Sequence, residues 1–73
     1  MGTVLYEYHR YGVNYTAEEP TLHAAMLRAY ADLQTNEAYA SVIVDADGTA
    51  YTHAAIRSYW NAHNIEAEYE STH

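Results

Sequence analysis

The stretch that decides the fold is Ile43-Val44-Asp45-Ala46-Asp47-Gly48-Thr49-Ala50-Tyr51 (IVDADGTAY), in which two carboxylates and a glycine separate two runs of strand-forming residues. It is either a cation-binding loop or a tight turn. A calcium loop of the EF-hand type needs a bidentate glutamate at position 12, but counting from Asp45 this position is Ile56. Asp-Gly, by contrast, supplies the positive φ that a short hairpin demands. The stretch is therefore predicted to be a turn.

This turn sets the direction of the two strands that flank it. Residues 39–45 are rich in β-branched side chains, and residues 49–52 follow the turn at once. A parallel return would need a crossover of about a dozen residues or more, so the two strands must form an antiparallel hairpin.

The N-terminal half is predicted to contain a strand and a helix. Apolar and polar residues alternate over 3–10, which is typical of a strand, and a turn follows at 11–14. Residues 13–16 either pair back as a short hairpin arm or run as a loop. A helix is expected over 20–36, entered at Pro20. Its apolar stripe comprises Leu22, Met26, Ala29, Tyr30 and Leu33. Its expected solvent face comprises His23, Arg28, Asp32 and Thr35.

The C-terminal third is predicted to be a helix followed by a strand. Thr52 suits a helix N-cap, and apolar and aromatic residues then recur at helical spacing up to His63. Asn64 suits a left-handed C-cap that Ile65 closes. Residues 65–70 then alternate between apolar residues and glutamates, which predicts an edge strand.

The predicted order is β-α-β-β-α-β over a single domain, residues 1–73. This is the arrangement of ferredoxin-like α+β folds, in which two helices cover one face of a four-stranded antiparallel sheet. The alternative is a βαββα domain with a frayed acidic tail over 66–73.

Composition excludes several classes of function. The 73 residues carry a net charge of −7, with three arginines, no lysine and no cysteine. A direct nucleic-acid binder needs a basic surface, so that class is disfavoured, and disulfides are excluded. The sequence contains neither a basic signal region nor 18 successive apolar residues, so we expect no contact with a membrane and a cytoplasmic protein.

No catalytic, metal or cofactor site is predicted. The serines lie outside any nucleophile motif, the glycines at 2, 12 and 48 form no phosphate loop, and a chain this small leaves little volume for a pocket. The histidines lack the spacing of a helical zinc site. His9 and His53 can approach each other if the first and third strands are neighbours, but they lack a third ligand. We therefore expect a protein that is not an enzyme.

Two features are predicted to bind a partner: the sheet face that the helices leave uncovered, and a row of glutamates. On the first strand, the side chains that point away from the helices are either Val4, Tyr6 and Tyr8 or Leu5, Glu7 and His9. RNA-recognition modules stack bases on such a face, but the acidic charge favours a protein partner here. The aromatic candidates are Tyr6, Tyr8 and Tyr51. The acidic candidates are Glu66, Glu68 and Glu70, which would form a row about 7 Å apart along one strand face.

The functional hypothesis is a small acidic interaction protein that occludes a basic, nucleic-acid-binding surface of a larger host enzyme or defence complex. In composition, the chain is similar in a general way to small phage-encoded accessory proteins, which implies an inhibitor. One alternative is a homodimer that buries the open sheet face and binds a small ligand there through His9 or His53. Another is a structural subunit of a larger assembly.

Overall fold

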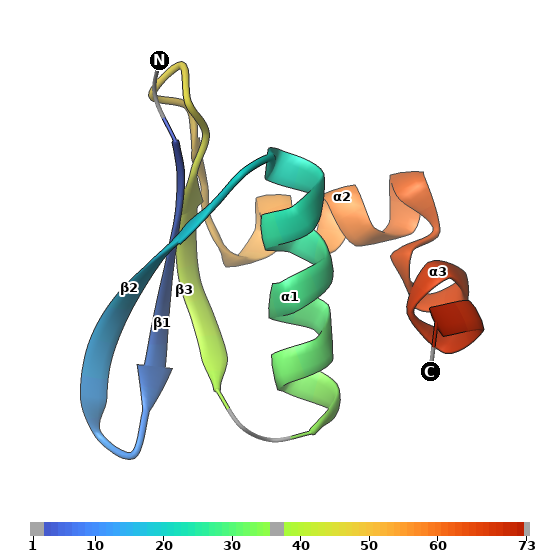
Figure 1. Ribbon diagram of the computed structural model, residues 1–73, viewed down its shortest axis with the longest axis horizontal. Helices are drawn as coiled ribbons and strands as arrows, with labels where there is room; N and C mark the ends of the chain where they lie inside the picture. The colour runs from blue at the N-terminus through green and yellow to red at the C-terminus, as the bar shows by residue number, and fades with distance from the viewer. Residues whose placement is uncertain (1–2, 36–37, 73) are drawn as a thin grey trace.

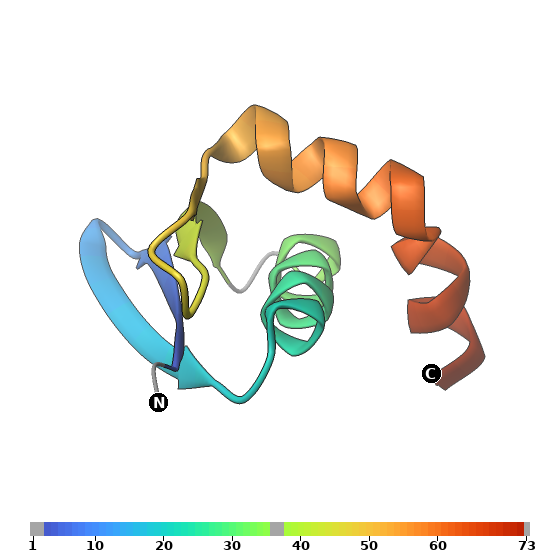
Figure 2. The same ribbon diagram turned by 90° about the horizontal axis from the view of Figure 1, so that it is seen from above.

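The computed structural model describes residues 3–35 and 38–72, which form an antiparallel sheet covered on one face by helices (Figures 1 and 2). The strands are β1 (Val4–Arg10), β2 (Val13–Glu19), β3 (Tyr39–Val44) and β4 (Ala50–Tyr51), in the spatial order β2-β1-β3-β4. The helices are α1 (Leu22–Gln34), α2 (His53–His63) and α3 (Ile65–Thr72).

The predicted α+β class, with a four-stranded antiparallel sheet, is confirmed, but the element order is not the predicted βαββαβ. Residues 13–19 form a full strand beside β1, and the predicted last strand is the helix α3. The hairpin arm left open at 13–16 is therefore real. The predicted helix end at Asn36 and the tail residue His73 lie outside the described residues.

The β1–β2 hairpin turns through two residues. Tyr11 and Gly12 have φ angles of 52° and 78°, so both are left-handed, as a type I′ turn requires. Arg10 and Val13 flank the turn as partners, and the register continues without a shift to Val4 and Glu19.

The stretch at 43–51 is a turn, as predicted. Gly48 has a φ of 92°, and the Asp45 carbonyl accepts a hydrogen bond from the Gly48 N–H at 2.9 Å. The Asp47 carboxylate accepts a hydrogen bond from the Thr49 N–H at 2.9 Å, and this contact helps lower the pKa of Asp47. Both aspartate side chains accept from turn amides, since Asp45 caps the N–H of Ala46 at 2.7 Å.

α1 begins at Leu22, two residues later than predicted, because Thr21 is its N-cap. The Thr21 hydroxyl accepts the Ala24 N–H at 3.1 Å, which satisfies one of the free amides of the first turn. The helix buries Met26 and Ala29 from the predicted stripe, together with Ala25.

The core lies between α1 and the sheet, and Tyr6 is at its centre. The core residues are Val4, Tyr6, Ala25, Met26, Ala29, Ile43 and Ile56. The Tyr6 ring is fully buried, and its hydroxyl donates a 2.8 Å hydrogen bond to Asp32 on α1. Burial, followed by the bond to Asp32, raises the pKa of Tyr6 far above its usual range, so this hydroxyl stays a donor.

Arg28 lies beside the same contact. Its guanidinium is 3.2 Å from the Glu19 carboxylate and lies over the Tyr6 ring, 5.7 Å from the centroid. Arg28 is exposed, as predicted, whereas Asp32 is half-buried, and the side chains of both residues also contact the sheet.

The corner between α2 and α3 follows the predicted cap. Asn64 has φ 51° and ψ 47°, its N–H bonds the Trp60 carbonyl, and Ile65 is fully buried. The chain then continues as a helix because Ala and Glu favour helices over strands, and because Ile65 and Tyr69, four residues apart, can both face α1. The Tyr69 ring packs 5.4 Å from the Tyr30 ring.

The buried hydroxyl of Tyr6 gives a direct test of this core. Tyr6→Phe keeps the ring but leaves Asp32 without its donor, so we expect the free energy of unfolding to fall by roughly 1 to 2 kcal/mol. Urea denaturation measures the change. Tyr11→Phe is the matched control, because Tyr11 is 86% exposed. Equal stability of the two variants would contradict the role of the bond.

Candidate functional site

The tyrosines predicted to form an open aromatic face lie on the other side of the sheet. Tyr6 is buried, and Tyr8 and Tyr51 are partly buried against the same core. The expected placement of these three residues on the uncovered face is therefore wrong. Period-2 alternation shows that one set of side chains is buried, but not which set.

The uncovered face carries the opposite set of side chains. Leu5, Glu7 and His9 of β1 lie there, next to their register partners on β2 and β3. These partners are Glu18, Thr16, Asn14, Val44, Val42 and Tyr39. Carboxylates and small polar groups separate the apolar side chains on this surface, and the aliphatic residues Leu5, Val42 and Val44 are half-buried.

The predicted row of glutamates belongs to a helix. Glu66, Glu68 and Glu70 lie on α3, so they do not share one strand face, and the predicted row is wrong. Glu66 and Glu70 are exposed and four residues apart, whereas Glu68 is half-buried and points to α1.

His23 joins the three helices. Its Nε2 lies 2.8 Å from the Glu68 carboxylate of α3, and its Nδ1 lies 3.0 Å from the Tyr59 hydroxyl of α2. A neutral His23 with its proton on Nε2 satisfies both bonds, donating to the carboxylate and accepting from the hydroxyl. The Tyr59 ring in turn stacks on His63 at 4.0 Å. The predicted solvent role of His23 is wrong.

His9 lies apart from this cluster, on the sheet. His9 bonds the Asn14 side chain at 3.1 Å, across the β1–β2 hairpin. Within residues 3–35 and 38–72, no group of three His, Asp or Glu side chains is placed to hold a metal ion.

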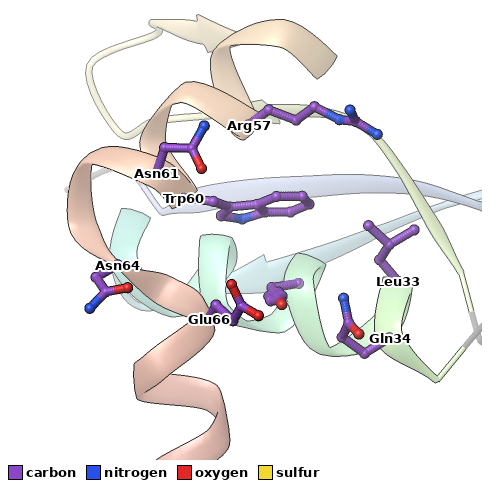
Figure 3. Close-up of a pocket in the computed structure, with 8 residues that line it drawn as sticks. Leu33, Gln34, Arg57, Trp60, Asn61, Asn64 and Glu66 are labelled. Atoms are coloured by element: carbon purple, nitrogen blue, oxygen red, sulfur yellow. The ribbon is translucent and has the colours of Figure 1, made fainter.

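A hollow of about 320 Å³ lies at the junction of the three helices (Figure 3). It is lined by Tyr30, Leu33, Gln34, Arg57, Trp60, Asn61, Asn64 and Glu66. α1 contributes its C-terminal half, α2 its last two turns, and α3 its first turn. The αL cap at Asn64 is what brings Glu66 back toward Trp60.

Trp60 is held rigidly in this hollow. Its indole N–H donates to the Met26 carbonyl at 3.0 Å, and its ring packs 5.3 Å from that of Tyr30. The side chain is still partly exposed. A fixed, partly exposed indole is a suitable surface for an apolar or cationic group.

The polar groups of the hollow are varied. Gln34, Asn61 and Asn64 each offer an amide donor and a carbonyl acceptor. Arg57 and Glu66 lie on opposite sides of the Trp60 ring in Figure 3. Carboxamides that both donate and accept match the peptide groups of a polypeptide segment better than they match a simple ion.

Arg57 and Glu66 are the charged residues in the lining of the hollow, and the carboxylates of Glu66 and Glu70 both lie near Tyr30. Partial burial raises the pKa of Tyr30, and the carboxylates of Glu66 and Glu70 raise it further. Within the described chain, Glu66 and Glu70 enter no ion pair. Like charges four residues apart on a helix repel by about 0.2 to 0.5 kcal/mol, so a cation placed there would be favoured.

A second exposed surface lies around the β1–β2 turn. Tyr11, Val13 and Tyr15 are exposed there, whereas Tyr39 is exposed on the uncovered face of the sheet, opposite His9 in the register. The sequence predicted a turn at 11–14 but left residues 13–16 open between a hairpin arm and a loop, so this surface was not identified. The Tyr11-Gly12 turn followed by alternation from Val13 is the signal that could have identified β2.

Comparison with protein families, curated proteins and solved structures found no match to this chain. Over the described residues, every helix is too short or too polar to cross a lipid bilayer.

The contact between His23 and Glu68 predicts how α3 is held. Glu68→Ala should lower the amide-exchange protection of α3 while changing the free energy of unfolding by about 1 kcal/mol or less, because a single hydrogen bond between partly exposed side chains contributes little. Hydrogen exchange read by NMR measures both effects. Glu70→Ala is the control, as Glu70 is exposed and makes no contact with His23. Unchanged amide-exchange protection of α3 in Glu68→Ala would show that the contact between His23 and Glu68 does not hold this helix.

Proposed function

We propose that the protein is a non-enzymatic interaction protein that binds a basic, partly apolar segment of a larger protein and so occludes the surface to which the segment belongs. The observation that carries this proposal is the hollow at the helix junction, where a rigid Trp60 and the Glu66 carboxylate of α3 are both part of the lining. Trp60 takes the place of Tyr6, Tyr8 and Tyr51 as the aromatic anchor.

The lining of the hollow supports a polypeptide ligand. The side chains of Gln34, Asn61 and Asn64 can pair with peptide N–H and C=O groups, which would otherwise lose their hydrogen bonds to water on binding. Trp60 and Leu33 provide the apolar area that such contacts need. Interfaces rely on a few buried aromatic anchors of this kind.

Charge supports a basic ligand. The chain has ten acidic residues against three arginines, and Arg28 is already engaged with Glu19. The carboxylates of Glu66 and Glu70 would attract a positively charged segment and steer its approach. A nucleic-acid-binding channel of an enzyme or defence complex offers such a surface, as an inhibitor would require.

A substitution that fills the hollow tests this function. Asn61→Trp places a large side chain in it without touching the core, whereas Ser58→Trp puts the same side chain on an exposed position of α2 outside it. Peptides selected from a displayed random library on the unmodified protein should be basic and partly apolar. They should bind Asn61→Trp at least about tenfold more weakly, and Ser58→Trp normally. Acidic selected peptides, or equal binding to both variants, would contradict the proposal.

Charge reversal tests the steering. Glu66→Lys with Glu70→Lys should slow association with a selected peptide and flatten its dependence on ionic strength, because exposed charges mainly affect association rates. Stopped-flow kinetics at low and high salt measure the effect. Glu7→Lys with Glu18→Lys makes the same change in net charge on the uncovered sheet face and should leave the rate nearly unaltered. If both pairs of substitutions slowed association equally, the carboxylates of α3 would have no specific role in steering the ligand.

A further inference from the structure

The two edges of the sheet differ in length and protection. One edge strand is β2, which has seven residues, most of them exposed. The other edge strand is β4, which has only two residues and is followed by α2. Figures 1 and 2 show β2 on the outer side of the molecule, at the opposite end from α3.

The hydrogen-bonding direction along β2 follows from the hairpin turn. In a two-residue turn the flanking residues are hydrogen-bonded to each other, here Arg10 and Val13. Antiparallel pairs alternate between bonded and non-bonded, so every second residue after Val13 bonds to β1. The backbone N–H and C=O groups of Asn14, Thr16 and Glu18 therefore point outward from the sheet.

Along this edge, the charges that usually prevent pairing are confined to the last two residues, Glu18 and Glu19. Natural edge strands are short, bulged, or interrupted by charges or proline. Residues 13–17 contain neither charge nor proline, and the register with β1 has no bulge. Val13 and Tyr15 are 50% and 44% exposed on this strand.

We propose that β2 pairs antiparallel with β2 of a second copy of the chain, about a twofold axis at Thr16. The four strands of each copy then form one continuous sheet of eight. Thr16 faces Thr16 of the second copy, Asn14 faces Glu18, Tyr15 faces Ala17 and Val13 faces Glu19.

The symmetry of the strand selects this register. Thr16 is the midpoint of Val13–Glu19, so it is the centre about which all seven residues pair. With this centre, the outward N–H and C=O groups of Asn14, Thr16 and Glu18 on both copies form hydrogen bonds across the interface. It places no two carboxylates opposite each other, whereas a centre at Glu18 would oppose Glu18 to itself, which is destabilising.

The assembly closes at two copies. β4 is too short to template a further strand and leads directly into α2, so growth at the other edge is blocked. Pairing at β2 leaves the hollow around Trp60 open on each copy. This inference rests on the β2 edge alone and does not depend on the proposed peptide binding.

Single cysteines test the register, because the chain has no cysteine of its own. Across a bonded antiparallel pair the α-carbons are about 5.5 Å apart, which a disulfide can bridge. Mild oxidation of Thr16→Cys should therefore convert most of the protein to a covalent dimer. Glu18→Cys is the control, since its two copies would lie roughly four residues apart along the strands, about 14 Å, and should not cross-link. Asn14→Cys mixed with Glu18→Cys should cross-link to each other.

Sedimentation of the unmodified protein completes the test. A dimer is expected, and Thr16→Pro should weaken it by about tenfold or more, because proline removes an outward N–H that no intrachain bond uses. Thr16→Val keeps the N–H and should remain dimeric. A monomer up to about 1 mM would overturn the proposal. A dimer in which Glu18→Cys cross-links as readily as Thr16→Cys would also overturn it. So would a dimer in which neither variant cross-links, which is the result expected for an interface on the uncovered sheet face. If Thr16→Pro fails to fold, the cysteine variants still decide.

Discussion

The hydrogen bond from the buried Tyr6 hydroxyl to Asp32 is the contact on which the rest of the structure depends. It places a polar atom at the centre of a small core, and that atom needs its partner because an unsatisfied buried hydroxyl is costly. The bond joins the buried face of β1 to α1, beside the apolar contacts of Tyr6 with Met26 and the rest of the core cluster. Arg28 then reaches Glu19 and the Tyr6 ring, which connects α1 to the edge strand β2.

The helix junction depends on a second polar contact. His23 on α1 binds Tyr59 of α2 and Glu68 of α3, so three elements distant in sequence meet at one imidazole. The hollow around Trp60 exists because Asn64 turns the chain and α3 returns against α1. In a domain too small for a large core, such junctions provide part of the stability.

Prediction from the sequence succeeded where local chemistry is specific and failed where two local patterns coincide. Asp45 to Gly48 can form a turn but lacks the ligands for calcium, and Asn64 tolerates the left-handed conformation of a cap. Residues 65–70 alternate in polarity, yet Ile65 and Tyr69 are also spaced for one helix face. The tertiary contact with α1 selects the helix. The candidate site was predicted in part, since Glu66 lines the hollow, but Trp60 was assigned to a helix and not recognised as the anchor.

The sequence by itself determined the α+β class, the antiparallel hairpin at 43–51, the positions of α1 and α2, and the acidic charge, because each depends on residues close together in the chain. Only the tertiary structure decided that Tyr6 faces the core, that β2 is a full edge strand, and that Trp60, Asn61 and Glu66 meet around one hollow. The physical reason is that alternation along a strand defines two faces without saying which is buried. That choice is made by the helix that packs on the sheet.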